Sequence, residues 1–225
     1  MSQLTLGGDQ RSADRNQLVI SYMLLRQIVG WIGTLLPIVL LIGGAISSQA
    51  RPDSMSGYYY TDMRNVFVGA LCALGAFLGA YDGYDWMDRW ITNVAGFCAI
   101  GVACCPTKPA VPHLSTWQQV VGDIHVFFAV TTFIMLGLMA LRFAKEGNDG
   151  DVSKRSRRDN FIYRACGITI LSCVMLAVLS NLLPASVNAH WPSLFIFEAV
   201  AVFAFGFSWF VRGQTMERTL NRIRS

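Results

Sequence analysis

The chain has 225 residues, of which 53% are hydrophobic and only 14% are charged, and its mean hydropathy is +0.43. An ordinary soluble domain carries roughly 25% charged residues, so this composition excludes a soluble enzyme and favours one polytopic membrane domain. The formal net charge is only +4, and no recognition motif is present, so nucleic acid is not an expected partner.

Six apolar runs have about the length of a membrane-spanning helix, which is roughly 20 residues for a core of about 30 Å. They cover residues 28–46, 65–81, 90–105, 120–141, 161–183 and 191–211. We therefore expect an all-α, six-helix transmembrane bundle over 28–211, with an N-terminal tail over 1–27 and a basic C-terminal tail over 212–225. The first run exceeds the apolar core of a signal peptide and is interpreted as a retained helix.

Basic residues are unevenly divided between the two sets of alternating loops. One set holds 15 of the 18 lysines and arginines, and the other holds only Arg51, Arg64 and Lys108. Because loops rich in Lys and Arg stay cytoplasmic, both termini are expected in the cytoplasm and the bundle in the plasma (cytoplasmic) membrane. The densest basic cluster, which we expect to contact anionic lipid headgroups, consists of Lys154, Arg155, Arg157 and Arg158.

Small and acidic residues in the second and third runs have structural interpretations. Gly75 and Gly79 lie four residues apart, as do other small residues of these runs, which predicts close helix packing, with homodimerisation as the alternative. Asp82, Asp85 and Asp88 lie in and after the short connecting loop, and without a calcium-loop pattern they predict a solvated acidic turn. The six cysteines are interpreted as apolar filler without a disulfide framework.

The loop side opposite the basic clusters has an unusual segment, Arg-Pro-Asp-Ser-Met-Ser-Gly-Tyr-Tyr-Tyr-Thr-Asp-Met-Arg, over residues 51–64. Its tyrosines are typical of an interfacial aromatic belt, and Asp62 has an ordinary interpretation as a helix N-cap. Further along, Ser115 and Gln118 have the spacing of a capping box, so the fourth helix is expected to begin near Ser115.

Polar residues within the apolar runs gather at one depth on this same side. Arg64, Asp123, His125 and Glu198 lie at similar depth on the second, fourth and last helices, although Asp123 and His125, two residues apart, project to different faces. The predicted ligand-binding residues are Ser54, Ser56, Tyr60, Asp62, Arg64, Asp123, His125 and Glu198. The structural alternatives are a hydrogen-bonded core histidine and an ion pair from Arg64 to Glu198 or Asp123.

Three histidines on this side, His113, His125 and His190, raise the question of zinc. No His-x-x-x-His or His-Glu-x-x-His pair occurs, so we expect neither a metal nor another cofactor. Serine-hydrolase, phosphate-loop and heme-attachment motifs do not occur either, and no catalytic residue is assigned.

The segments 54–67, 93–97 and 122–129 resemble a group of bacterial six-helix membrane proteins and, more remotely, the DRAM, Frag and Sfk/CWH membrane family. The resemblance implies a Ser/Asp-containing first loop, a histidine in helix four and an acid in the last helix. These positions would be Ser56 with Asp62, His125 and Glu198. A compact Ser-Asp pair is replaced here by two residues separated by the tyrosines. Members are associated with lipid handling and membrane-linked regulation.

Three classes of function fit these residues. We favour a non-enzymatic membrane protein whose outer cavity binds a lipid headgroup or small polar ligand, or which acts as a partner subunit. An intramembrane metal-dependent lipid hydrolase using His125 with Asp123 or Glu198 is the second class, and a small proton-coupled transporter using these three residues is the third. Membrane lipids are the expected partners, and a homo-oligomer or membrane-protein partner stays open.

Overall fold

The computed structural model of the chain describes residues 24, 26–47, 51–81, 83, 85–146, 154–182 and 194–224. Within these residues the chain forms helices and no strand, so the predicted all-α class is confirmed. The elements are an N-terminal helix (Arg26–Ile46), the 3-10 helix η1 (Ser56–Tyr60), α2 (Arg64–Gly79), α3 (Trp86–Cys104), α4 (Thr116–Glu146), α5 (Lys154–Leu182) and α7 (Leu194–Arg224).

Four of the described helices are long and apolar enough to cross a membrane. The corresponding segments are Arg26–Ile46, Thr116–Ala144, Arg157–Ser180 and Leu194–Gly213. The α2 helix is apolar but has only 16 residues, which is about 24 Å at 1.5 Å per residue. The α3 helix has 19 residues, with an acid and an arginine in its first turn. The fold is thus that of a membrane-embedded helical protein, in which the second and third predicted spans are the short ones.

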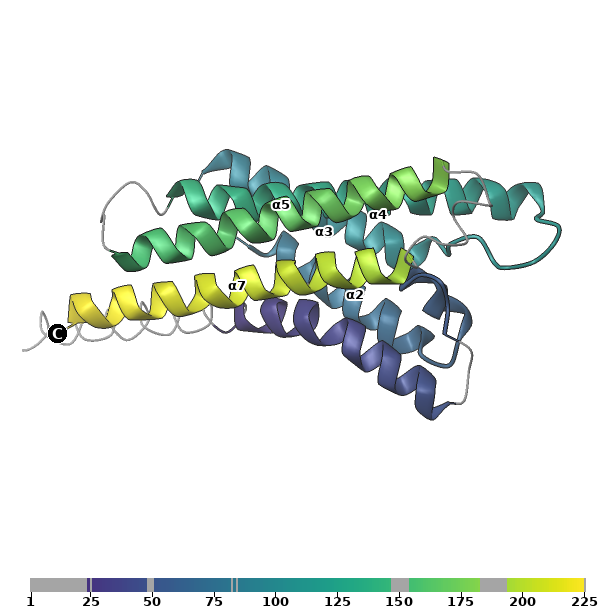
Figure 1. Ribbon diagram of the computed structural model, residues 1–225, viewed down its shortest axis with the longest axis horizontal. Helices are drawn as coiled ribbons and strands as arrows, with labels where there is room; N and C mark the ends of the chain where they lie inside the picture. Colours follow the sequence, from purple (N-terminus) through teal and green to yellow (C-terminus); the bar gives the residue numbers. More distant parts are fainter. Residues whose placement is uncertain are drawn as a thin grey trace, which may run out of the picture.

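Helices that follow each other in the chain lie side by side in the bundle (Figure 1). Contacts join α2 to α3, α3 to α4, α4 to α5 and α5 to α7, and α7 also contacts α4. The N-terminal helix packs beside α7, where the ring centroids of Trp31 and Phe210 lie 4.8 Å apart. Short connections between antiparallel neighbours are typical of up-and-down helical bundles.

Glycines allow close approach at two helix interfaces. A Cβ atom on Gly206 of α7 would lie 2.7 Å from the Gly30 carbonyl oxygen of the N-terminal helix, and one on Gly96 of α3 would lie 2.5 Å from the Gly75 carbonyl oxygen of α2. No real Cβ is found so close to a backbone atom, so only glycine fits these positions without a shift. The predicted packing role of small residues is confirmed at Gly75, and the Gly79 backbone N also lies 3.1 Å from a Cβ added at Gly96. A Cβ added at Gly79 itself would have nothing within 4 Å.

We use "basic end" for the end of the bundle that carries Arg26, Arg142 and Arg212. Here the helices extend further than the apolar runs predict, since α4 continues to Glu146, α5 begins at Lys154 and α7 runs through the predicted C-terminal tail to Arg224. Hydropathy marks only the apolar part of a helix, and Lys, Arg, Glu and Gln are good helix formers that continue it into a polar environment.

Asp88 at the basic end corrects the prediction of a solvated acidic turn, because its side chain is fully buried. Arg142 of α4 hydrogen-bonds to Asp88 and also lies 2.6 Å from the Asp85 carboxylate. Asp85 caps α3 by accepting the Asp88 backbone N–H at 2.8 Å. That N–H and the Arg142 guanidinium lower the pKa of Asp85 below its ordinary value. Asp82 lies outside the described residues.

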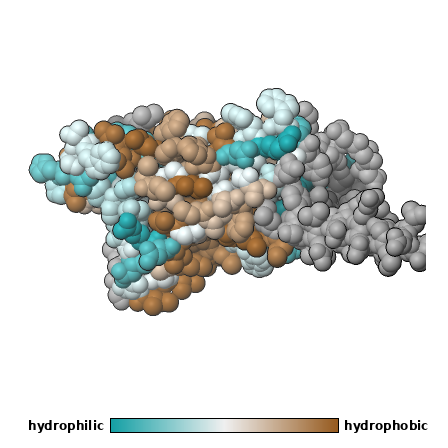
Figure 2. All heavy atoms as spheres, turned by 180° about the vertical axis from the view of Figure 1, so that it is seen from behind, coloured by the Kyte–Doolittle hydropathy of each residue, from teal (hydrophilic) through white to brown (hydrophobic). Residues whose placement is uncertain are grey.

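The opposite end of the bundle carries the loops 51–63 and 105–115, which we call the loop cap. Hydrophobic residues cover much of the middle of the bundle, and hydrophilic residues gather at the loop-cap end (Figure 2). The predicted capping box is confirmed, since the Gln118 N–H donates to Ser115 Oγ at 3.2 Å and the Ser115 N–H donates to Gln118 Oε1 at 2.9 Å. Asp62 is exposed and is not the N-cap of α2, which is Met63. All six cysteines are free.

Candidate ligand-binding cavity

Three of the predicted site residues meet beneath the loop cap. Ser56 of η1, His125 of α4 and Glu198 of α7 line the same two cavities. The first cavity, of about 100 Å³, extends from these residues between α4, α5 and α7, and the second, of about 50 Å³, extends along the bundle interior. The three polar side chains therefore stand at the junction of two largely apolar spaces.

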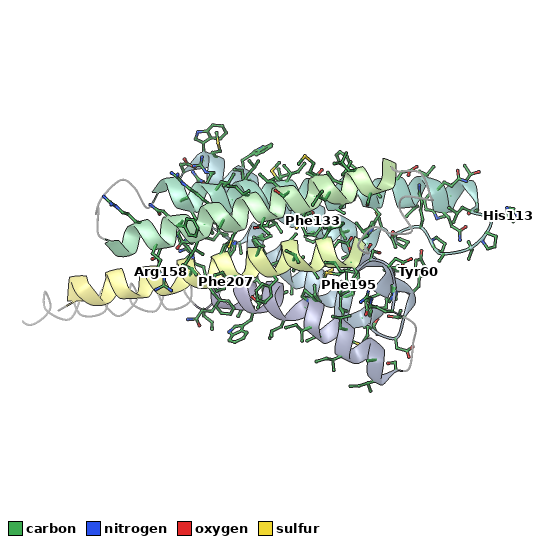
Figure 3. All side chains as sticks on the ribbon, in the orientation of Figure 1. Tyr60, His113, Phe133, Arg158, Phe195 and Phe207 are labelled. Atoms are coloured by element: carbon green, nitrogen blue, oxygen red, sulfur yellow. The ribbon has the colours of Figure 1, made fainter. Side chains whose placement is uncertain are left out.

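Glu198 enters this junction because it lies one turn into α7, close to the loop that follows the N-terminal helix. Its Oε2 accepts the Met55 backbone N–H at 2.5 Å, and the Ser56 N–H also reaches the carboxylate. One turn earlier, the Phe195 N–H donates to the Asp53 carbonyl oxygen at 2.6 Å. The loop is thus held against the start of α7, and Figure 3 shows Phe195 close to the segment that carries Tyr60.

His125 faces the bundle interior, and its side chain is only 3% exposed. Its Nδ1 lies 2.6 Å from the Cys105 carbonyl oxygen, just past the end of α3, and the Val102 carbonyl is also within reach of the ring. A carbonyl oxygen only accepts, so Nδ1 carries the proton in this contact. In the neutral ring Nε2 is then an acceptor.

Ser56 is held in place by its own turn. Its Oγ lies 3.2 Å from Ser54 Oγ, and Ser54 Oγ accepts the Gly57 N–H at 3.0 Å. Ser54 itself lines neither cavity. Ser54 therefore supports the turn, and Ser56 presents its hydroxyl to the cavities.

The two loops of the cap are fastened to each other and to α4. The Tyr60 hydroxyl donates to the Thr107 carbonyl oxygen at 2.6 Å. Burial raises the pKa of the Tyr60 hydroxyl, which keeps it a donor well above neutral pH. Lys108 Nζ lies 2.6 Å from the Asp123 carboxylate. The cap thus covers the polar junction with hydrogen-bonded loop backbone.

The structure does not bring the other predicted residues to the junction. The Asp123 side chain is 69% exposed in its pair with Lys108, and the Arg64 side chain is exposed and donates to the Tyr59 hydroxyl at 2.7 Å. Arg64 therefore does not form the alternative ion pair with Glu198 or Asp123. Tyr60 lines a separate cavity of about 180 Å³ between the cap and α4.

Sequence reasoning missed Thr107 and most of the apolar wall. Thr107 lines the first cavity together with Phe133 and Cys173, which come from α4 and α5. Thr107 lies in a loop of ordinary polarity, and nothing in its spacing distinguishes it. Phe133, labelled in Figure 3 near the middle of the bundle, lines both cavities.

Glu198 is the acidic group at the junction. Among the described residues, no lysine or arginine lines either cavity, and Glu198 is the one carboxylate that does. Within the same described part of the chain, no three His, Cys, Asp or Glu side chains are placed to hold a metal ion. His113 lies at the tip of its loop (Figure 3), and His190 lies outside the described residues.

Comparisons with known proteins give no match: no family model fits the sequence, and no curated protein or solved structure is significantly similar to it. The resemblance to the DRAM, Frag and Sfk/CWH family stays a prediction.

Proposed function

We propose that the chain is a non-enzymatic membrane protein whose cavity beneath the loop cap binds the polar end of a lipid or of a small amphipathic ligand. The observation that carries the proposal is the convergence of Ser56, His125 and Glu198, from three separate elements, on the same two cavities. An acidic side chain and a histidine within apolar helices raise the free energy of a membrane-embedded protein. A binding site that uses both side chains explains why they are present.

The shape of the first cavity supports a lipid. Its lining includes Val126 of α4 and Val178 of α5, and both side chains are exposed on the apolar outer surface of the bundle. A ligand in the bilayer would therefore reach the cavity from the side, with its apolar part between the helices and its polar part at Glu198. Binding sites for such ligands are usually apolar pockets that contain a few polar groups at defined positions.

The topology belongs to the same proposal. All six helices cross the membrane, both termini lie in the cytoplasm, and the loop cap faces outward, which agrees with the 15-to-3 division of basic residues. The short α2 and α3 are accommodated by local thinning or by protein neighbours. Arg157 and Arg158, exposed on the first turns of α5, would then meet anionic headgroups of the inner leaflet.

The hydrolase and transporter alternatives gain no support from the geometry. The transporter uses Asp123 with His125 and Glu198, but Asp123 pairs with Lys108 on the surface. The hydrolase needs a metal held by His125 with Asp123 or Glu198, and among the described residues no three His, Cys, Asp or Glu side chains are placed to hold one.

Lipid retention tests the proposal. Ala129 lines both cavities, so Ala129→Phe should fill them, whereas Ala76→Phe places the same side chain on the exposed face of α2 as a matched control. We expect mass spectrometry to find about one ligand per chain on the wild type and on Ala76→Phe, and a several-fold loss on Ala129→Phe. Equal retention by all three proteins would contradict the proposal.

A further inference from the structure

We infer that the ligand of this cavity is an amphiphile with an amine head, an ammonium group on a hydrocarbon chain, and not a phosphate- or carboxylate-headed lipid. The inference rests on the proposed function and specifies the class of ligand. It is carried by three observations: the acidic lining of the cavities without Lys or Arg, the partners of Glu198, and the acceptors that face the cavities.

The charge of the lining disfavours an anionic head. Glu198 lines both cavities, and no Lys or Arg among the described residues does so. The three cations of the loop cap and the start of α2 have other partners. Lys108 pairs with Asp123, the Arg64 guanidinium lies 4.2 Å from the centroid of the Tyr59 ring, and the Arg51 guanidinium lies 5.5 Å from the centroid of the Phe195 ring. Sites that recognise phosphate or carboxylate supply Arg, Lys or a helix N-terminus, and a lone carboxylate repels both anions.

Among the described residues, no cation is a partner of the Glu198 carboxyl group. The contacts given for the carboxylate come from the backbone N–H groups of Met55 and Ser56, which are neutral. A charge within a membrane-spanning segment is stabilised by an opposite charge, and none of the described side chains supplies one. A ligand ammonium would supply it.

The junction also offers as many acceptors as an ammonium has donors. An ammonium group carries three N–H donors and no acceptor. The Glu198 carboxylate, the Ser56 hydroxyl and the neutral His125 ring, whose Nδ1 is occupied by the Cys105 carbonyl, can each accept one hydrogen bond. Beyond them the lining is mostly apolar, with Phe133, Leu136 and Phe205 on the inner cavity, so the rest of the ligand is hydrocarbon. Two further hydroxyls line the cavities, those of Thr107 and of Thr132, and Thr132 donates to the Phe128 carbonyl oxygen of its own helix at 2.8 Å.

Three probes with the same twelve-carbon chain separate the classes: dodecylamine, dodecanol and dodecanoate. Each is titrated by calorimetry at pH 7 into the purified, delipidated full chain in a nonionic detergent. We expect dodecylamine to bind at least about tenfold more tightly than either other probe, a difference of roughly 1.4 kcal/mol. Because this comparison uses the wild type, it holds even if a variant fails to fold.

Two variants locate the preference. Glu198→Gln keeps the shape and an acceptor oxygen but removes the charge, so the preference for dodecylamine over dodecanol should disappear. Asp123→Asn removes a carboxylate at similar depth that lines neither cavity, and it should leave the preference unchanged.

The outcomes distinguish this inference from the proposed function. If dodecanoate bound more tightly than dodecylamine, or dodecanol bound equally well, the amine assignment would be overturned. If Ala129→Phe then lost the binding of that probe, the result would still support a ligand cavity. Binding of dodecylamine that persists in Glu198→Gln would also overturn the inference. No binding of any probe, together with no retained lipid, would overturn the proposed function itself.

Discussion

Glu198 stabilises the loop cap in addition to lining the cavities. Its carboxylate accepts the backbone N–H of Met55 at the start of η1, while Phe195 on the same helix holds the Asp53 carbonyl. The residue that we assign to ligand recognition is therefore also the residue that positions Ser56. A substitution of Glu198 can therefore change both the stability of the loop cap and the binding of a ligand, so the two effects are measured on different variants.

Replacing Glu198 by Met keeps the length of the side chain but removes its acceptor. The N–H groups of Met55 and Ser56 then lose their partner, which should lower the free energy of unfolding by about 1–3 kcal/mol. Glu198→Gln should lose less, because its amide oxygen still accepts. Denaturant unfolding in detergent micelles measures the difference, and a Met variant as stable as the Gln variant would show that this contact contributes nothing.

The sequence predicted which polar residues could form a site, but not which of them lie next to one another in the structure. His125 and Glu198 stand out because such side chains are rare in apolar runs, and depth along the helix placed them correctly at one level. The two-residue spacing of Asp123 and His125 predicted different faces, and Asp123 does face the surface and Lys108, but the spacing did not show which of the two residues faces the interior. Depth likewise did not show that Arg64 faces outward and donates to the Tyr59 hydroxyl.

At the scale of the helices, the interfaces depend on glycine. Gly96 of α3 contacts the Gly75 backbone of α2, and an added methyl group there would lie 2.5 Å from the carbonyl oxygen. These short helices therefore pack backbone to backbone.

Gly96→Ala tests this interface, and Gly69→Ala is its control, because an added Cβ at Gly69 has nothing within 4 Å. Overpacking should make Gly96→Ala less stable than the wild type by about 1–3 kcal/mol. The control should gain up to about 1 kcal/mol from the better helix propensity of Ala. Thermal unfolding in the same detergent compares the stabilities of the two variants. Equal stabilities would show that the close contact between α2 and α3 does not contribute to stability.

Local signals predicted the helices well, and long-range pairs escaped prediction. The capping box at Ser115 is a three-residue pattern, and it set the start of α4 correctly. Asp88 was misjudged because its partner Arg142 is 54 residues away on another helix, and no spacing rule connects them. Residues 212–225 were predicted as a basic tail because hydropathy falls there, although α7 continues as a helix to Arg224.

For the whole molecule, the proposed orientation puts the loop cap outside and the basic end in the cytoplasm. Cys104, exposed at the end of α3, is a native reporter of the cap side, and Asn160→Cys on α5 reports the basic end. An impermeant maleimide added to intact cells should label Cys104 and spare position 160 until the membrane is opened. A background with Cys104→Ser and Cys105→Ser removes both native thiols at the cap and isolates the second site. Labelling of both positions in intact cells would contradict the topology.

The central claim is that the junction of Ser56, His125 and Glu198 holds the polar end of a ligand. A crystal structure of the protein purified gently from its own membrane, with no lipid added, tests it most directly. The account predicts electron density for an elongated non-protein molecule in the cavity, with its polar end within about 3 Å of the Glu198 carboxylate, a normal hydrogen-bond distance. A cavity closed by side chains, or Glu198 paired with a lysine or arginine of the protein, would contradict it.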